Sequence, residues 1–211
     1  MFSLKLDKGG KRFQHEWVFR NLSLDLKAGT KLAVTGGNGS GKSTLIKCLA
    51  GQMPFTEGKI QFFNDKAEIP DSDYYKQLVI SAPYLELPEE FSLREFLHFH
   101  FKFKKISGGL TLNELAKTLY LEHALNKPIS YFSSGMKQRL KLGICFFSQA
   151  NLVLLDEPTS NLDSQGIAWY RDLVQLEGQD KCLIIASNDP REYDFCRLTV
   201  KMENFKKKIS L

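Results

Sequence analysis

Apolar and polar residues alternate in the first part of the chain, and this pattern predicts β-strands. The alternation runs through residues 2–7 and again through 19–26, where Leu22, Leu24 and Leu26 fall on one face. Successive side chains of a strand point to opposite faces, so the pattern is typical of strands with one buried face. We therefore expect the chain to begin with half-buried strands.

Three continuous apolar segments have the pattern of strands that are buried on both faces. They lie at residues 30–35, 151–156 and 182–186. Buried parallel strands have this composition, and helical segments separate the three. The first is followed by a glycine-rich turn and by a predicted helix that stops at Gly51. The pattern predicts an α/β sheet with helices on its faces.

Helical periodicity dominates the middle of the chain. Residues 92–103, 111–120 and 135–147 each place apolar residues at helical spacing. No internal repeat or low-complexity segment is present, so the chain is interpreted as one folded unit.

The predicted elements divide this unit, residues 1–211, into two parts. Residues 1–87 and 151–211 are expected to form the α/β core. Residues 88–150 are expected to form a helical subdomain inserted into that core.

The composition is that of an ordinary globular protein. Of 211 residues, 43% are hydrophobic and 25% are charged. No segment approaches the roughly 20 apolar residues of a membrane-spanning helix. The N-terminal residues carry charge almost at once and lack the apolar centre of a signal peptide. We expect a cytoplasmic protein that reaches the cytoplasmic face of the membrane only through a partner.

Cysteine spacing bears on the redox state of the thiols, and net charge bears on whether the protein binds nucleic acid. The four cysteines, Cys48, Cys145, Cys182 and Cys196, form no CxxC pair. Three of the four lie in apolar segments, which is typical of buried, reduced thiols. The net charge of +5 is mild, and the lysine run at 206–208 is interpreted as a solvated tail. No nucleic-acid partner is expected.

A phosphate-binding loop follows the predicted strand at 30–35. The segment reads Gly36-Gly37-Asn38-Gly39-Ser40-Gly41-Lys42-Ser43-Thr44 and matches the pattern GxxxxGK[ST] between a strand and a helix. Glycines let the backbone curl so that successive N–H groups point at a phosphate, and the following helix presents its positive end. Lys42 is expected to reach the β- and γ-phosphates of a nucleotide, and the Ser43 hydroxyl to ligate Mg²⁺.

Two adjacent carboxylates end the predicted strand at 151–156. Asp156 is placed to hold hydrated Mg²⁺ opposite the phosphate loop. Glu157 is placed to polarise an attacking water. A nucleotide-hydrolysing site needs both a metal ligand and a base, and the two carboxylates can supply one each.

Two further segments give a resemblance to a known family. Glu157 is followed by Pro158-Thr159-Ser160-Asn161-Leu162-Asp163, and an earlier segment reads Tyr131-Phe132-Ser133-Ser134-Gly135-Met136-Lys137-Gln138-Arg139-Leu140. With the phosphate loop, they resemble the nucleotide-binding domain of ABC ATPases over nearly the whole chain. The resemblance implies an α/β fold: a P-loop NTPase core with a mainly parallel sheet, N-terminal antiparallel strands and an inserted helical subdomain.

The resemblance also implies roles for segments outside the phosphate loop. Ser133, Ser134 and Gly135 would belong to the signature segment that caps the γ-phosphate bound to a second subunit. The segment 160–163 would be the D-loop, which crosses the dimer interface. Phe13 lies where the family places an aromatic ring that stacks on adenine, and Trp17 is the alternative.

Three departures from the family pattern concern catalysis. Tyr84 stands where the family has a glutamine near the metal, and a neutral phenol is a poor ligand for Mg²⁺. Asn188 replaces a histidine; it can donate to a γ-phosphate oxygen but carries no charge. Ser134 and Met136 replace the glycine and glutamine of the signature. Losing one preorganised donor costs about 2.7–4 kcal/mol, and a retained neutral donor should cost less.

The resemblance implies an ATPase subunit that uses ATP and Mg²⁺ and pairs with a second ABC ATPase subunit, as a homodimer or heterodimer. It would power transport through integral membrane transporter subunits, which determine the substrate. The short chain resembles the small subunits of bacterial exporters, including those linked to haem export in cytochrome c maturation. The alternative is a slow, nucleotide-gated dimerisation or regulatory module, which Tyr84 and Asn188 favour and Glu157 opposes.

Overall fold

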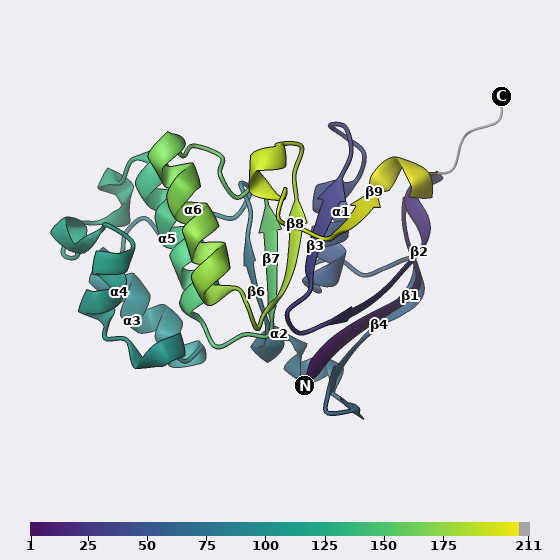
Figure 1. Ribbon diagram of the computed structural model, residues 1–211, viewed down its shortest axis with the longest axis horizontal. Coiled ribbons are helices and arrows are strands. Elements are labelled where there is room, and N and C mark those ends of the chain that lie inside the picture. The colour runs from purple at the N-terminus through teal and green to yellow at the C-terminus, as the bar shows by residue number, and fades with distance from the viewer. Residues whose placement is uncertain (207–211) are drawn as a thin grey trace.

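A parallel sheet forms the centre of the molecule in the computed structural model, which describes residues 1–206 (Figure 1). Lys207 and Lys208 of the lysine run lie outside the described residues. The sheet has the order β6-β7-β8-β3-β9, and all neighbouring strands are parallel. Its strands are β3 (Lys31–Thr35), β6 (Leu78–Ser81), β7 (Leu152–Asp156), β8 (Cys182–Ala186) and β9 (Leu198–Lys201).

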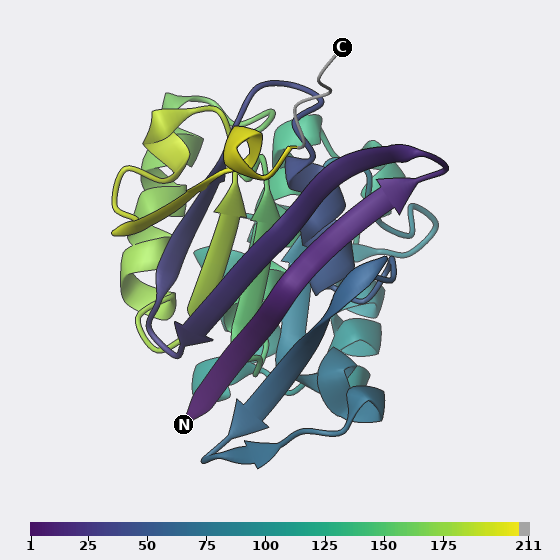
Figure 2. The same ribbon diagram turned by 90° about the vertical axis from the view of Figure 1, so that its right-hand side faces the viewer.

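A second, antiparallel sheet lies on one side of the first and is seen in front in Figure 2. Its order is β2-β1-β4-β5. The strands are β1 (Phe2–Phe13), β2 (Glu16–Lys27), β4 (Glu57–Asn64) and β5 (Ala67–Glu68).

Six α-helices and six short 3₁₀ helices complete the described part of the chain. The α-helices are α1 (Lys42–Leu49), α2 (Tyr74–Gln77), α3 (Leu93–Phe103), α4 (Leu112–Thr118), α5 (Ser134–Phe147) and α6 (Ser164–Glu177). The 3₁₀ helices are η1 (Asp71–Asp73), η2 (Ser107–Gly109), η3 (Glu122–Ala124), η4 (Ile129–Tyr131), η5 (Pro190–Glu192) and η6 (Met202–Phe205). In residues 1–206, no helix combines the length and the apolar character needed to cross a membrane.

Strand β7 shows why the central strands are apolar throughout. Leu152 and Leu154 pack with α1 and the antiparallel sheet in one buried cluster. Val153 and Leu155 pack with α3, α4, α5 and α6 in another. Alternate residues of a strand point to opposite faces, so a sheet covered on both sides needs apolar residues at every position. The parallel sheet is therefore the middle layer between the two cores.

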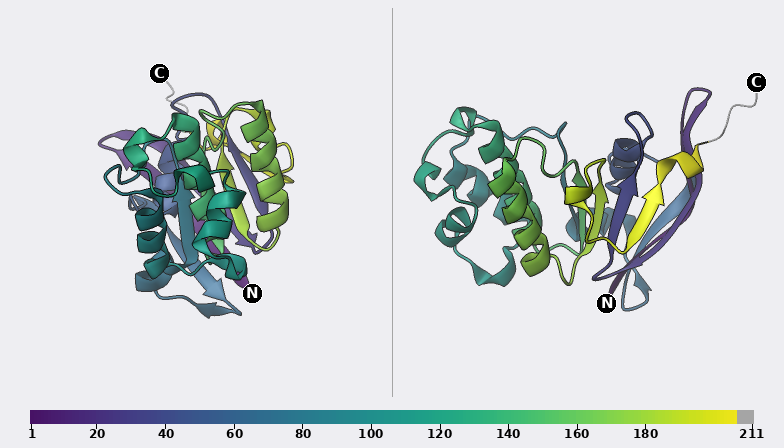
Figure 3. Two further views of the ribbon diagram at one scale, coloured as in Figure 1. Left: turned by 90° about the vertical axis from the view of Figure 1, so that its left-hand side faces the viewer. Right: turned by 45° about the horizontal axis from the view of Figure 1, so that its top comes forward.

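The helices from the middle of the chain lie together on one side of the molecule (Figure 3, left). Side-chain caps define the starts of three of them. Ser92 and Thr111 begin α3 and α4, each in a capping box with a glutamate three residues later. Ser133 caps α5, accepting from the N–H of Met136. Each cap satisfies backbone donors that the first turn leaves free. The expected helices at 92–103, 111–120 and 135–147 are present, within two residues at each end.

The predicted fold class is confirmed: an α/β fold with a mainly parallel sheet, antiparallel N-terminal strands and helices between β6 and β7. The two N-terminal strands are longer than the alternating pattern suggested. Register shifts between Leu6 and Lys11 carry β1 through the polar segment that interrupts the pattern. A β-bulge thus lets the strand continue where the alternation fails. The division at 88 and 150 remains an interpretation, because α5 and α6 share one core with the sheet.

Candidate active site

The motif residues gather at one edge of the parallel sheet because the strands that precede them are in register. Ala186 at the end of β8 is level with Asp156 of β7 and with Val34 of β3. The first residue after β7 and the first after β8 are each hydrogen-bonded to the neighbouring strand. Glu157 N–H donates to the Ala186 carbonyl at 2.9 Å, and Ser187 N–H donates to the Val34 carbonyl at 3.1 Å. Ligands of open parallel sheets bind at this carboxyl edge.

The phosphate loop has the backbone that its glycines allow. Gly39 and Gly41 have φ values of 73° and 103°, in the region that favours glycine. A side chain on Gly41 would also clash with Val18, since its Cβ would lie 2.5 Å from Val18 Cγ1. Helix α1 begins directly after Gly41, so its free N–H groups face the loop. The loop provides an anion site from one continuous segment.

Lys42 lies within this loop and is almost fully buried. Its Nζ donates to the carbonyl of Gly36 at 2.6 Å and contacts that of Gly37 at 3.4 Å. The ammonium group is thus held over the loop where phosphates would enter. The Ser40 hydroxyl is buried nearby without a hydrogen-bond partner among the described residues. A buried cation and a free hydroxyl fit a phosphate group.

Asp156 is a buried carboxylate whose surroundings suit a cation. Its side chain is 2% exposed, and Oδ1 has no partner within residues 1–206. Burial raises its pKa, whereas a hydrogen bond with the Ser43 side chain lowers it and Glu157 raises it further. A buried carboxylate with one unpaired oxygen is costly unless a cation neutralises it. Ser43 and Asp156 therefore fit Mg²⁺, the metal expected from the sequence.

Glu157 and Asn188 face the phosphate loop across a cleft of about 480 Å³. Asn38 of the loop also lines this cleft, and the Asn188 amide Nδ2 donates to Asn38 Oδ1 at 3.1 Å. Glu157 follows Asp156 directly, in a left-handed backbone conformation with φ 46°. The structure thus brings the candidate base and the candidate phosphate donor together beside the loop.

Tyr84 packs against Lys47 of α1, near the predicted metal ligand Asp156. Lys47 Nζ lies 4.0 Å from the centroid of its ring, a close cation–π contact. Burial and, to a lesser extent, the charge of Asp156 raise the Tyr84 pKa. The phenol therefore stays neutral at pH 7, in agreement with its poor suitability as a ligand for Mg²⁺.

A second cavity, of about 450 Å³, lies between Gly39 and the β1–β2 hairpin. Phe13 and Trp17 both line it. The Trp17 ring packs on the guanidinium of Arg20, whose Cζ lies 4.5 Å from the ring centroid, and covers Gly10. Phe13 is half-exposed beside Gly39, which is the arrangement that adenine stacking needs. Phe13 remains the predicted adenine contact.

The signature segment lies apart from the phosphate loop of the same chain. Ser133 caps α5, and Gly135 packs against the carbonyl of Asn161. Within residues 1–206, neither of the two cavities lined by phosphate-loop residues includes Ser133, Ser134 or Gly135. This separation is what a segment that serves a second subunit would show.

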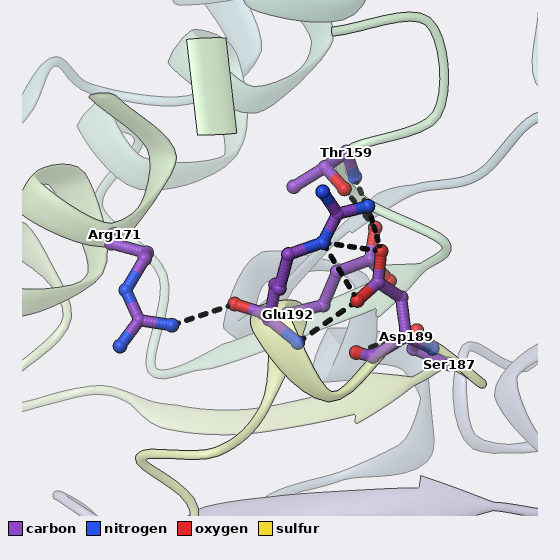
Figure 4. Close-up of polar contacts among 6 residues, drawn as sticks. Thr159, Arg171, Ser187, Asp189 and Glu192 are labelled. Carbon is purple, nitrogen blue, oxygen red and sulfur yellow. Dashed lines mark hydrogen bonds and ion pairs between the residues drawn. The ribbon is translucent and has the colours of Figure 1, made fainter. Parts of the chain in front are cut away.

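Three residues that the sequence interpretation missed contact these segments. Glu203 accepts from the N–H of Gly37 at 2.7 Å, and this bond lowers its pKa. Gln138 Nε2 donates to the Pro158 carbonyl at 2.6 Å. The Glu192 carboxylate accepts from Thr159, as Figure 4 shows. Each partner lies at least 20 positions away in sequence, so no local pattern could reveal the contacts.

Comparison with known proteins identifies the family of this fold and site. The sequence model of the family described as "ABC transporter" matches residues 19–160. The ATP-binding protein YybJ of Bacillus subtilis, described as an uncharacterized ABC transporter protein, is 28% identical; the match covers 92% of this chain and 89% of YybJ. The cytochrome c biogenesis ATP-binding export protein CcmA of Agrobacterium fabrum is 30% identical, with 86% of each covered.

Solved structures agree with this fold. The dimeric structure of MJ0796, a bacterial ABC transporter cassette, superposes with a TM-score of 0.78 at 20% identity, and 94% of each chain is covered. The family match spans well over half of the chain and includes the phosphate loop, Asp156 and Glu157. The chain therefore belongs to the ABC transporter family of ATP-binding proteins.

Proposed function

We propose that this chain is the ATP-hydrolysing subunit of an ABC transporter and that it works as a two-fold dimer with a second copy of itself. The observation that supports this most is the convergence of Lys42, Asp156 and Glu157 at one sheet edge. A module that only binds nucleotide needs the loop and a metal ligand but has no need of a base beside them.

Each site residue has a separate role in the proposed phosphoryl transfer. Lys42 and the N–H groups at residues 39–44 hold the β- and γ-phosphates of ATP. Ser43 and Asp156 would hold Mg²⁺, which supplies neutralising charge to those phosphates. Glu157 orients a water for in-line attack on the γ-phosphorus, and Asn188 donates to a γ-phosphate oxygen. Because such catalysis is chiefly positioning and electrostatics, it requires a closed site.

The closed site needs a second subunit, whose α5 would begin over the γ-phosphate. The free N–H groups and the positive end of a helix stabilise an anion at that position. In a two-fold dimer each subunit gives its Ser133 segment and receives the other's, so both sites close together. Bound ATP then contacts both subunits and stabilises the dimer, and release of ADP and phosphate lets the subunits separate. The dimeric cassettes among the solved structures support this arrangement.

The membrane subunits are proposed to dock on the exposed rings of α3. Phe99 and Phe103 are exposed, and their centroids lie 5.2 Å apart. Phe91 packs edge-on against Phe99 at 5.8 Å. An exposed aromatic cluster on the helical part, following the loop of Tyr84, suits a helix of a membrane partner. The chain would thus lie on the cytoplasmic face of the membrane.

Steady-state ATP hydrolysis by the purified chain with Mg²⁺ tests the proposal. We expect a rate that rises more than linearly with protein concentration and disappears in Lys42→Ala and Glu157→Gln. Tight ATP binding with no turnover above the Glu157→Gln background would contradict hydrolysis by the isolated chain. That result would favour a regulatory module or a subunit that needs a different partner.

A further inference from the structure

The turn that carries Glu157 is strained and must be held by its surroundings. Glu157 has φ 46°, a left-handed conformation that side chains other than glycine rarely adopt. Its carbonyl accepts from Ser160 N–H at 3.1 Å, which closes a turn over Pro158 and Thr159. A residue in such a conformation persists only where neighbouring contacts determine it.

Gln138 holds this turn from the side of the helices. It lies on α5, one turn after the Ser133 cap, and its side chain is buried. Its Nε2 donates to the Pro158 carbonyl at 2.6 Å. The amide therefore fixes the backbone directly after Glu157.

Glu192 holds the turn at its next residue, Thr159 (Figure 4). This buried carboxylate accepts from Thr159 N–H at 2.6 Å and from the Thr159 hydroxyl through the same Oε1. Its backbone is fixed in turn, because the buried Tyr170 hydroxyl of α6 donates to the Glu192 carbonyl at 3.0 Å. The acceptor thus rests on a rigid part of the core.

The carboxylate of Glu192 accepts hydrogen bonds from Thr159 and forms no ion pair within residues 1–206. The neighbouring Arg191 turns to Asp189 at the surface, with 2.6 Å between Nη2 and Oδ2. Burial raises the Glu192 pKa, while its hydrogen bonds with Thr159 lower it. Ser187, which directly precedes Asn188, lines the same cleft as Thr159 and Glu192. Glu192 therefore lies beside both the turn of Glu157 and the loop of the phosphate donor.

We propose that Gln138 and Glu192 form a clamp that positions Glu157 for water activation. Neither residue belongs to the proposed set of phosphate, metal and base groups; both act on the backbone, through Pro158 and Thr159. The proposal rests on the hydrolytic function proposed above, because it assigns Glu157 the base role. A misplacement of about 1 Å at a reacting group can lower the rate about 100-fold, so two short bonds beside the base are enough to control turnover.

The test compares four variants of the full chain with the wild type and with one control variant. Gln138→Leu and Glu192→Ala each remove one side of the clamp. Thr159→Val removes only the hydroxyl donor with little change of shape, and Thr159→Ser retains that donor. Arg191→Ala is the matched control, since it alters the same loop without touching the clamp. The turnover number, the ATP dissociation constant and amide hydrogen exchange are measured for each.

We expect Gln138→Leu and Glu192→Ala to lower the turnover number about tenfold or more, with ATP affinity changed less than about threefold. Thr159→Val should show a smaller loss that Thr159→Ser restores. Amide exchange should become faster at residues 157–163 and stay unchanged at the phosphate loop, 36–44. Arg191→Ala should match the wild type in all three measurements.

Three outcomes would overturn the clamp: folded variants with wild-type turnover, parallel losses of turnover and ATP affinity, or unchanged exchange at 157–163. If Gln138→Leu or Glu192→Ala fails to fold, the Thr159 pair decides by the same measurements. A wild-type chain that hydrolyses no ATP refutes the proposed function instead. In that case exchange at 157–163 alone decides whether Gln138 and Glu192 hold the turn.

Discussion

The phosphate loop and the opposite wall of the active-site cleft are built in different ways. The loop takes all its groups from one segment of nine residues, Gly36 to Thr44, which runs from the end of β3 into the first turn of α1. Its conformation follows from local features, which are glycines with positive φ and a helix start. Such a segment needs little from the rest of the fold except a strand and a helix at its ends.

The groups opposite the loop come from distant segments. Glu157 follows β7 and Asn188 follows β8, and both line the cleft. Tyr84 follows β6, the next strand, so the sheet brings the three residues to one edge. Two of the three depart from the family pattern, whereas the loop matches its pattern in full. The comparison indicates that the phosphate-binding groups are encoded locally. The candidate hydrolytic groups are brought together by the tertiary structure and, in the proposed mechanism, are completed by a second subunit.

Separating binding from hydrolysis has the largest expected effect. Lys42→Ala should weaken ATP binding and abolish turnover, because it removes the cation that holds the phosphates. Glu157→Gln should keep ATP binding within a few-fold and lower turnover about 100-fold or more, since an amide is a far weaker base. Nucleotide titration and steady-state hydrolysis measure the two effects. Wild-type turnover in Glu157→Gln would show that the base lies elsewhere.

Restoring a charge at position 188 should have the next largest effect. Asn188→His adds a donor that can carry positive charge next to the γ-phosphate, and we expect turnover to rise about three- to tenfold. Asn188→Ala removes the donor and should lower turnover about tenfold or more, by the cost of one such bond. Single-turnover hydrolysis separates these changes from product release. Equal rates in all three proteins would remove Asn188 from the mechanism.

A smaller effect is expected at Tyr84. Tyr84→Gln supplies a carbonyl oxygen near the metal site, so the Mg²⁺ concentration that gives half-maximal hydrolysis should fall about two- to fivefold. Tyr84→Ala is the control, because it removes the ring and its contact with Lys47 without adding a ligand. If both variants lower the Mg²⁺ concentration for half-maximal hydrolysis to the same extent, the tyrosine ring obstructs the metal site. The glutamine then does not act as a metal ligand.

The smallest effect on activity is expected for His100→Gln, which should instead change how the free energy of unfolding depends on pH. It is partly buried on α3, with Nε2 3.0 Å from Ser148 Oγ, and burial and then Lys104 lower its pKa from 6.5 to about 4. Between these values the unfolded chain binds the proton and the folded chain does not. Stability therefore falls as pH drops through this window, by at most about 1.4 kcal/mol per pH unit. Denaturant unfolding of His100→Gln should show a weaker pH dependence, and an unchanged slope would contradict this assignment.

Local patterns predicted the phosphate loop and the buried strands closely. The segments 151–156 and 182–186 became β7 (Leu152–Asp156) and β8 (Cys182–Ala186), because continuous apolar runs are what a doubly covered sheet needs. Strand β9 (Leu198–Lys201) gave no such signal, since it is a short and largely exposed edge strand. Glu192 and Gln138 were missed because their partners are 33 and 20 positions away.

The signature segment shows the limit of both sequence and single-chain structure. Ser133 is visible as a helix cap, but its proposed phosphate belongs to a second subunit. Its role depends on an assembly rather than on any contact within the chain. A direct test must therefore measure association.

Sedimentation of Glu157→Gln, with ATP or with ADP, tests the two-subunit site most directly. We expect a dimer with ATP and a monomer with ADP, because only the γ-phosphate reaches the Ser133 segment of the other subunit. Adding Ser133→Asp should keep the protein monomeric, since it retains a helix cap but repels phosphate, whereas Ser133→Asn should still dimerise. A monomer at saturating ATP, or a dimer that ignores both nucleotide and Ser133→Asp, would contradict the account.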